Sequence, residues 1–358
     1  MRVCIIGSGL SALTLAKALV NEKIDVDIVH DDKQQKINYS RTIGISKSNF
    51  DFFNKNIVNI EKIIWKLKKI EIFSDNLKNE KILNFSSYND QLFSIIKNFK
   101  LYNILNKSLL NNKLCKKIIF GKKLPDFTKY NLIINTDNKS YFTKKFFNKK
   151  IIKEYNSFAY TTIIYHKKIL NNIAVQIFTK EGPLAFLPIS ENETSVVYSI
   201  HNSNKINKKN IKNLIHKYNL KYKIKKIDKL EFFELKSFSL RSYYNENILA
   251  FGDLLHKIHP LAGQGFNMTI RDIMILIKIV KEKKNLGLPL DSSINKQFET
   301  QTRHINYIFS TSIDLIHEFF NMERKINSSV LSKYVRLIGN NSSLNKMFTK
   351  IADKGLVF

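Results

Sequence analysis

The chain contains 358 residues, of which 44% are hydrophobic and 25% are charged. This is the composition of an ordinary globular protein and excludes a wholly disordered chain. The two cysteines, Cys4 and Cys115, form no paired motif, which argues against a disulfide scaffold or a structural zinc site. Since no run of 18 apolar residues and no secretory signal are found, we expect a cytoplasmic protein, with peripheral attachment to the inner face of the membrane as an alternative.

The formal net charge is +29, and 52 of the 59 basic residues are lysine. Nucleic-acid sites usually use arginine for bidentate contacts, so nucleic acid is not the expected partner. A lysine excess with abundant asparagine and isoleucine is typical of an AT-rich genome. The alternative is a functional charge that holds the protein near an anionic membrane surface.

The first third of the chain begins with a βαβ pattern. Residues 1–6 predict a strand, residues 10–20 a helix with an apolar stripe, and residues 26–29 a second strand. Residues 45–70 predict a helix around Phe52, Phe53 and Trp65, followed by an extended segment at 70–73. Residues 90–112 predict a further helix, and residues 132–134 a short buried strand.

The pattern changes to short β-rich segments after residue 157. Residues 160–165, 174–178, 184–188 and 195–200 predict an antiparallel sheet with turns between the strands. A solvated helix is expected within 202–229, a buried strand at 248–251, a helix at 265–284 and mostly helix over 293–358. The predicted fold is therefore α/β, with an antiparallel β-sheet domain inserted into a Rossmann-type nucleotide-binding domain and a helical C-terminal tail.

Residues 7–12, GSGLSA, follow the first predicted strand and open the first helix. Gly7 allows a tight turn, Gly9 lets a pyrophosphate approach the backbone, and the small Ala12 lets helix and strand pack closely. The helix N-terminus supplies N–H donors and partial positive charge for phosphates. The ribose-binding acid expected about 20 residues further on falls on His30, with Asp31 directly after it.

A second motif occupies residues 251–272. A buried strand ends at Gly252 and Asp253, a loop follows that contains Pro260, and a glycine-rich segment then opens a helix. Asp253 can accept hydrogen bonds from a sugar-like polyol. The N-terminus of the helix can hold an electron-rich ring edge through backbone N–H groups. The residues of this segment predicted to bind a cofactor are Gly263, Gln264, Gly265, Phe266 and Asn267.

This second motif resembles the pattern GDAAHxxHPxxGQGxNxxxxD of the ubiquinone-biosynthesis ring hydroxylases. These belong to the FAD-dependent aromatic hydroxylases of the para-hydroxybenzoate hydroxylase fold. Residues 40–46, with Arg41, resemble the family's arginine segment near the flavin, and residues 176–188 resemble its F-x-x-x-GPLAxLP stretch. The family's Asp-Gly motif corresponds here to Asp137 and Asn138, where asparagine is the non-glycine residue best able to take a positive φ.

The resemblance implies a Rossmann-type FAD-binding domain formed by residues 1–70, 95–155 and 236–290. It also implies a substrate-side β-sheet domain formed by 71–94 and 156–235, and a C-terminal helical region at 291–358. The cofactor would be FAD, and NAD(P)H the co-substrate. The implied reaction is hydroxylation of the aromatic ring of a polyprenylated phenol in ubiquinone biosynthesis, through a flavin C4a-hydroperoxide.

Within this scheme Arg41 and Pro260 would position the flavin, and no side-chain base can be assigned. The implied partners are the polyprenylated phenol and either a membrane surface or a multiprotein quinone-biosynthesis complex. No metal site is expected, because His256 and His259 have no evident third ligand. Another FAD-dependent oxidoreductase, such as a prenyl-chain reductase, remains an alternative. A non-catalytic flavin-binding accessory protein is a second alternative, since His30 and Asn138 depart from the family pattern.

Overall fold

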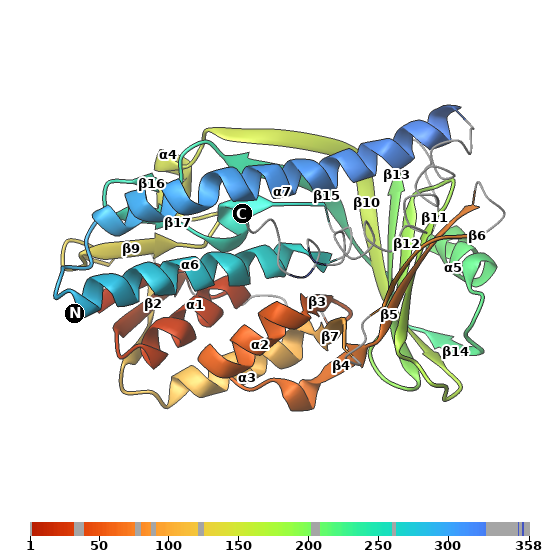
Figure 1. Cartoon of the computed structure of the whole chain (residues 1–358), viewed down its shortest axis with the longest axis horizontal. Coiled ribbons are helices and arrows are strands. Elements are labelled where there is room, and N and C mark those ends of the chain that lie inside the picture. The colour runs from red at the N-terminus through yellow and green to blue at the C-terminus, as the bar shows by residue number, and fades with distance from the viewer. Residues whose placement is uncertain are drawn as a thin grey trace.

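The fold is known from a computed structural model that describes residues 2–31, 39–75, 80–86, 91–120, 125–201, 208–259 and 263–326, together with residues 350 and 353. Three sheets are found within this part of the chain. Figure 1 shows the first sheet with helices α1 (Leu10–Asn21) and α6 (Gly265–Asn285) on the left and the largest sheet on the right, while the long helix α7 (Ser293–Ile326) runs across the top from left to right. None of the described helices combines the length and apolar character that crossing a bilayer requires.

The first sheet is largely parallel and has the strand order β16-β17-β9-β1-β2-β8. β17, β9, β1, β2 and β8 run parallel to one another, and β16 is antiparallel to β17. Its strands are β1 (Arg2–Ile6), β2 (Asp25–Asp31), β8 (Cys115–Phe120), β9 (Leu132–Asn135), β16 (Tyr244–Asn245) and β17 (Ile248–Ala250). Nearly every residue of β1, β9 and β17 is buried. Continuous apolar runs of this kind are typical of strands in parallel sheets.

The main hydrophobic core lies around this first sheet and contains residues of α1, α3 (Asn98–Leu110) and α6. α1 packs against both α3 and α6. The predicted βαβ opening, the return strand at 248–251 and the helix that follows it are confirmed. As a result, segments more than 200 residues apart in the sequence meet at one sheet edge.

The largest sheet contains nine strands in the order β18-β15-β10-β13-β12-β11-β5-β6, with β14 pairing with β10. Helix α5 (Lys208–Tyr218) packs on it through Ile211, Ile215 and Tyr218. The predicted antiparallel segments all lie in this sheet. Its strands are β5 (Lys69–Ser74), β6 (Glu80–Ser86), β10 (Lys150–His166), β11 (Ile173–Phe178), β12 (Pro183–Pro188), β13 (Glu193–His201), β14 (Ile224–Ile227), β15 (Glu231–Leu240) and β18 (His256–Lys257).

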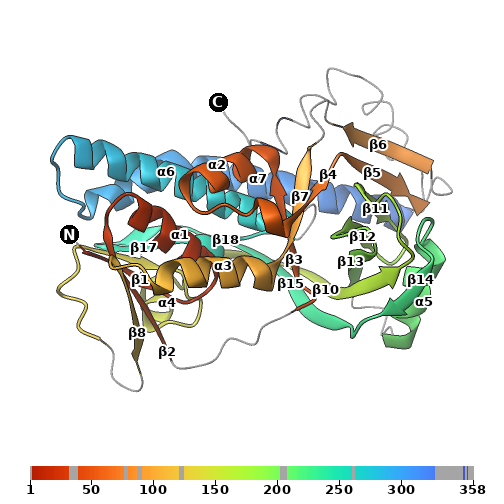
Figure 2. The same cartoon turned by 90° about the horizontal axis from the view of Figure 1, so that it is seen from below.

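A third sheet, which the sequence did not predict, contains β3 (Thr42–Ser46), β7 (Phe93–Lys97) and β4 (Ile64–Leu67) in the order β3-β7-β4. Figure 2 shows it between the first sheet and the largest one. Two predictions were therefore wrong. Helix α2 (Lys47–Asn56) ends long before residue 70, and Trp65 lies in a strand rather than a helix. Residues 93–97 also form a strand, and the predicted 90–112 helix begins only at Asn98.

Strand pairing explains both errors, since β7 is antiparallel to β3 on one side and to β4 on the other. A short apolar run such as 93–96 cannot be assigned to helix or strand by periodicity alone. Within 202–229, helix occupies only 208–218 and β14 follows it, while residues 202–207 lie outside the described residues. Helix over 293–358 is confirmed as far as Ile326. Beyond that residue the structure describes only residues 350 and 353.

Candidate functional site: a cavity at the carboxyl edge of the parallel sheet

A cavity of about 990 Å³ lies between the carboxyl edge of the first sheet and the largest sheet. This volume is at the upper end of the range of about 300–1,000 Å³ for small-molecule pockets. Ligands of open parallel sheets bind outside the carboxyl ends of the strands. Four strand ends contribute residues here. Gly7 to Ser11 follow β1, and His30 and Asp31 lie at the end of β2. Thr136 to Lys139 follow β9, and Asp253 follows β17.

The turn after β1 requires glycine at position 7. Gly7 has a φ of +118°, which other residues rarely adopt, and its N–H donates to the Val29 carbonyl at 2.8 Å. A Cβ at this position would lie 2.4 Å from the Thr136 Oγ1. Thr136 cannot easily move away, because its N–H and hydroxyl both donate to the Ile6 carbonyl, at 2.9 and 2.8 Å. Thr136 was not identified from the sequence.

The N-terminus of α1 faces this cavity. Gly9 is the N-cap in an extended conformation, and no described side chain caps it. The first helical N–H groups therefore remain available for an anion, and the helix dipole favours negative charge at this end. Ser8, Gly9 and Leu10 line the cavity, whereas Ala12 is completely buried in the core. These features fit the phosphates of a dinucleotide.

The end of β2 brings His30 and Asp31 to the cavity wall, as the spacing predicted. Both residues are half-buried. The His30 Nδ1 lies 2.8 Å from the backbone oxygen of Asp31. This contact turns the imidazole toward its own backbone and fixes its orientation.

The turn after β9 differs from the expected one. Asp137 and Asn138 line the cavity, but Asn138 does not take a positive φ. Hydrogen bonds form the turn instead. The Asp137 carboxylate accepts from the Lys139 N–H at 2.8 Å, and the Asp137 carbonyl accepts from the Thr143 hydroxyl at 2.6 Å. The expectation of a left-handed asparagine was therefore wrong, because local side-chain bonds stabilise another conformation.

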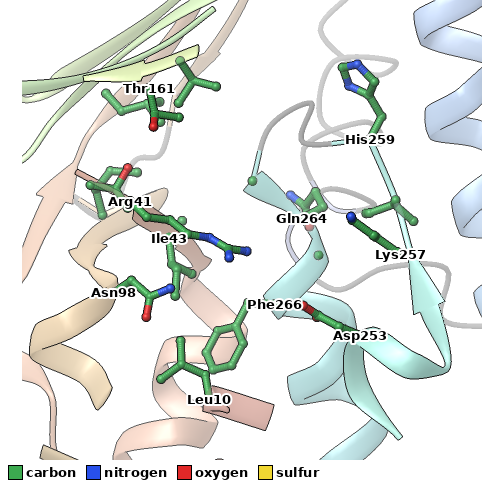
Figure 3. A pocket seen from close by; sticks show the side chains of 18 of the residues that line it. Leu10, Arg41, Ile43, Asn98, Thr161, Asp253, Lys257, His259, Gln264 and Phe266 are labelled. Carbon is green, nitrogen blue, oxygen red and sulfur yellow. The ribbon is translucent and has the colours of Figure 1, made fainter. Parts of the chain in front are cut away.

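The end of β17 is held close to α1. Gly252 has a φ of +64°, and a Cβ there would lie 2.5 Å from the Ser11 Cβ. Gly252 itself does not line the cavity, but it lets the strand end approach the helix and so places Asp253 on the wall. The Asp253 side chain is exposed to the cavity, and Figure 3 shows it on the same side as Lys257 and Gln264. A carboxylate in this position can accept hydrogen bonds from a polyol.

The segment that opens α6 is fixed to β3 by the side chain of Asn267. Its Oδ1 accepts from the Ser46 N–H at 3.0 Å and from the Asn49 Nδ2 at 2.9 Å, and its Nδ2 donates to the Gly44 carbonyl at 3.0 Å. Asn267 is completely buried and does not line the cavity. The structure therefore places it as a support for the glycine segment rather than on the wall.

Gly263, Gln264, Gly265 and Phe266 do line the cavity. Gly263 has a φ of +62°, and a Cβ there would lie 3.4 Å from the Gly44 N. β3 thus lies directly against the start of this segment.

Arg41 precedes β3 and extends across the cavity toward Gln264 (Figure 3). In this view the Arg41 side chain enters the cavity from the side of β3, with its guanidinium at the tip. Phe266 packs against Phe53 of α2, with ring centroids 6.3 Å apart. Pro260, the other predicted flavin-positioning residue, lies outside the described residues.

His256 and His259 make separate contacts. The His256 Nε2 lies 2.6 Å from the Asp272 Oδ2, and both side chains are almost completely buried. Asp272 also accepts from the Asn306 Nδ2 at 2.9 Å, so this network joins β18, α6 and α7. The His259 ring packs edge-on against Tyr155 at 4.8 Å. The final Asp of the motif is thus the hydrogen-bond partner of its first His, a pairing that the sequence analysis did not assign.

Asp353 lines the cavity and was also missed. Its carboxylate accepts from the Ser48 N–H at 2.8 Å in the first turn of α2, where an acid stabilises the helix. Its carbonyl accepts from the Ser46 hydroxyl at 2.8 Å and from the Arg271 Nη2 at 3.2 Å. Burial lowers the pKa of Arg271 to about 10. Since Asp353 lies about 300 residues from α2 in the sequence, no local pattern could have identified this contact.

The opposite wall of the cavity is mainly apolar and comes from the third and the largest sheet, including β5, β11, β12, β13 and β15. A few polar groups, among them Thr161 and Gln176, interrupt it. Such a wall fits a hydrophobic ligand held by a small number of polar contacts. The apolar side chains that line it include Ile43, Leu67, Ile70, Ile72, Phe85, Leu92, Phe93, Ile95, Ala174, Val175, Ala185, Leu187, Val197, Phe233, Leu235 and Ile258.

A largely parallel sheet, a helix N-terminus that fits phosphates, and an antiparallel sheet across one cavity together form the fold of the FAD-dependent monooxygenases. The comparisons with known proteins agree. Residues 164–284 match the family model described as FAD binding domain. FAD as the cofactor is confirmed by this match, and the resemblance found in the sequence is confirmed by it together with the relatives and solved structures below.

The curated relatives are more specific. The chain is 28% identical over 125 residues to the mitochondrial ubiquinone biosynthesis monooxygenase COQ6 of Schizosaccharomyces pombe, which covers 35% of this chain and 26% of that protein. It is 29% identical over 153 residues to the 3-demethoxyubiquinol 3-hydroxylase of Escherichia coli, which covers 40% of this chain and 39% of that protein. The chain thus matches well under half the length of these two relatives.

Solved structures share the fold over almost the whole chain. The p-nitrophenol 4-monooxygenase PnpA of Pseudomonas putida superposes with a TM-score of 0.78 at 11% identity, covering 99% of this chain and 98% of that one. HpxO of Klebsiella pneumoniae, complexed with FAD and uric acid, superposes with a TM-score of 0.76 at 12% identity, covering 99% and 97%.

We expect the Gly7→Ala variant to bind FAD at least about tenfold more weakly, because the added Cβ is strained at this φ and meets the Thr136 hydroxyl. Titration of the apoprotein with FAD, followed by flavin fluorescence, measures the affinity. The Thr136→Ala change in the same chain removes the clashing oxygen and should recover part of it.

Gly287→Ala is the matched control, since Gly287 also has a positive φ of +66° but has open space around its Cα. It should lose about 1 kcal/mol of stability and no FAD affinity. Unchanged FAD affinity in Gly7→Ala would contradict the close-approach argument.

The Asn267→Ala variant should lose about 3 kcal/mol of folding stability, because the Ser46 N–H and the Gly44 carbonyl become unpaired inside the protein. FAD affinity should fall with it, since the glycine segment is no longer fixed to β3. Asn295→Ala provides the comparison. Asn295 is equally buried, but its side chain donates to the Glu246 carbonyl, outside the cavity lining. Denaturant unfolding and FAD titration of both variants separate the two effects, and equal loss of FAD affinity in both would show that Asn267 has no special role.

Proposed function

We propose that this protein is an FAD-dependent monooxygenase that hydroxylates the aromatic ring of a polyprenylated phenol, with NAD(P)H and O2 as co-substrates. One observation carries the proposal. On one side of a single cavity lie the strand ends and the helix N-terminus that fit a dinucleotide, and on the other side lies a long apolar wall. A flavin held on the first side would place its ring next to a hydrophobic substrate on the second. The names of the relatives support ubiquinone precursors as the substrate class.

The bound FAD would supply the redox chemistry, which consists of hydride acceptance from NAD(P)H and activation of O2. The residues of this chain bind and orient it. The α1 N-terminus would hold the pyrophosphate, Asp253 the ribityl or ribose hydroxyls, and the backbone N–H groups after Gly263 an electron-rich edge of the flavin ring. Arg41 would add a positive charge from the opposite wall.

Exclusion of water is the second task of the site. The largest sheet supplies apolar side chains over the substrate half of the cavity. Asp353 and Arg271 join the chain's C-terminal part to α2 and α6 at the edge of this cavity. A dry, preformed site strengthens electrostatic interactions and limits side reactions with solvent.

The Asp253→Ala variant should bind FAD at least about tenfold more weakly, because hydrogen bonds to a charged group contribute roughly 1.5–3 kcal/mol. The control is Asp126→Ala, since Asp126 is an exposed carboxylate outside the cavity lining. Flavin fluorescence titration of both variants measures the difference.

The direct test of the proposed reaction starts from reconstituted protein with FAD. Anaerobic reduction by NADH and by NADPH is followed at the flavin absorbance band, with and without a short-chain prenylphenol. Air is then admitted, and mass spectrometry should find the phenol with one added oxygen atom. Flavin reduction with loss of a prenyl double bond would indicate a prenyl-chain reductase. Flavin binding without reduction would indicate a non-catalytic accessory protein. Either result would contradict the proposed hydroxylation.

The apolar wall predicts substrate selectivity. Ala185 lines the cavity from β12, and an Ala185→Phe change would fill part of the space beside it. We expect KM for long-chain prenylphenols to rise at least about tenfold while KM for a phenol with one prenyl unit stays within about twofold. Equal effects on both substrates would show that this wall does not hold the chain.

A further inference from the structure

The charged residues of the segment from 138 to 153 are all positive. It contains six lysines and no acidic residue. It forms helix α4 (Tyr141–Phe146) and the first residues of β10. Lys153 pairs with Glu318 at 3.3 Å, so the positive potential of the segment comes from the other five lysines. Figure 1 places this part of the chain on the side opposite to α2 and α3.

Large apolar side chains are exposed in the same segment. Tyr141 is 51% exposed, Ile151 50% and Ile152 60%. Neighbouring residues of a strand point to opposite faces, so the exposure of both isoleucines means that β10 is uncovered on both faces here. Among the described strands, one edge of β10 is uncovered here as well. Over Lys150–Glu154 the strand pairs only with β15, and β13 joins it only from Ser157 onward.

The cations of this segment remain available to an external partner. Lys144, Lys145 and Lys149 are exposed and form no ion pair with any residue that the structure describes. The ammonium of Lys145 lies 5.6 Å from the centre of the Tyr141 ring, so a charge and an aromatic ring stand side by side. The backbone N–H of Arg241, a further exposed basic residue, donates to the Lys149 carbonyl at 3.2 Å.

We propose that a basic apolar face docks the protein, edge-on, on the surface of an anionic lipid bilayer. This face is formed by Tyr141, Lys144 and Lys145 of α4, by Lys149, and by the uncovered edge of β10, with Ile151 and Ile152 on either side of that edge. Stable binding of a protein to a membrane surface takes two signals, and this face has both. Its lysines attract anionic headgroups, and its isoleucines and tyrosine can enter the interface. Tyrosine and lysine are also residues that favour the boundary between lipid and water.

Two other occupants fit this face less well. A second copy docked symmetrically would bring two sets of lysines together, because the same patch meets itself in a two-fold interface. A nucleic acid would neutralise the lysines but leave the isoleucines without an apolar partner. A bilayer surface satisfies the charge and the apolar side chains together.

This face lies close to the cavity. Lys139 lines the cavity and lies two residues before Tyr141, so the face begins next to the cavity wall. The docking proposal goes beyond the proposed hydroxylation and does not depend on it, because the face contains none of the residues assigned to FAD.

The test uses the full-length protein with FAD and sedimentation of extruded vesicles. One set of vesicles contains only phosphatidylcholine, and the other contains roughly a third phosphatidylglycerol. We expect binding to the anionic vesicles and a clear decrease at high salt, since the attraction is screened. The paired Ile151→Ser and Ile152→Ser changes should weaken binding about tenfold or more, and so should the triple Lys→Gln change at Lys144, Lys145 and Lys149.

Matched controls come from the opposite side of the molecule. Lys55, Lys107 and Lys113 are exposed lysines near the ends of α2 and α3, and their triple change to Gln removes the same charge. Leu110 is 61% exposed, and Leu110→Ser removes an apolar side chain there. Both controls should bind vesicles within about twofold of the unchanged protein, because these residues lie away from the docking face.

Three results would overturn the docking proposal. The first is that the unchanged protein does not bind anionic vesicles at low salt. The second is that the face variants and the controls lose binding equally. The third is that the isoleucine variant changes its oligomeric state while its vesicle binding stays intact. Flavin absorbance and NAD(P)H oxidation with a water-soluble phenol are measured on every variant. Normal flavin chemistry without vesicle binding refutes docking alone, whereas vesicle binding by a protein that takes up no flavin refutes the proposed reaction alone.

Discussion

The cavity depends on the close approach of backbone segments that are far apart in the sequence. Gly7 lies against Thr136, and Gly252 lies against Ser11, at distances where a Cβ would meet another atom at about 2.5 Å or less. Both glycines have a positive φ, so sterics and backbone conformation both favour glycine there. These contacts bring three strand ends to one place. Without them the parallel sheet would still form, but its carboxyl edge would not offer a narrow phosphate-sized cradle.

A second layer of contacts joins this cradle to the rest of the molecule. Asn267 connects the start of α6 to β3, and Asp353 connects the C-terminal part of the chain to α2. Neither side chain depends on a ligand for its hydrogen bonds. The cavity is therefore largely preorganised by the protein itself, which reduces the cost of ordering when a cofactor binds. The same preorganisation favours catalysis, because groups held in place need not reorient during the reaction.

The two halves of the cavity have different chemistry because they come from different kinds of sheet. In the parallel sheet, strand ends and helix N-termini present backbone N–H groups, which suit phosphates and polar ring edges. In the largest sheet, side chains of neighbouring strands stand side by side on one face and form an apolar wall. One cofactor with a charged end and a flat ring, next to a hydrophobic substrate, matches this division. The basic apolar face begins beside the first half, the half that fits the cofactor.

The sequence by itself determined the βαβ opening, the positions of the glycines and Asp253, and the antiparallel segments after residue 157. These follow from periodicity and from local backbone requirements, which act between residues close in sequence. Only the tertiary structure decided that residues 64–67 and 93–97 are strands, that Asn138 has a negative φ, and that Asp272 pairs with His256. The reason is physical. Strand pairing and buried hydrogen bonds connect residues that are distant along the chain, and their free energy can exceed the small local preferences that a sequence pattern reports.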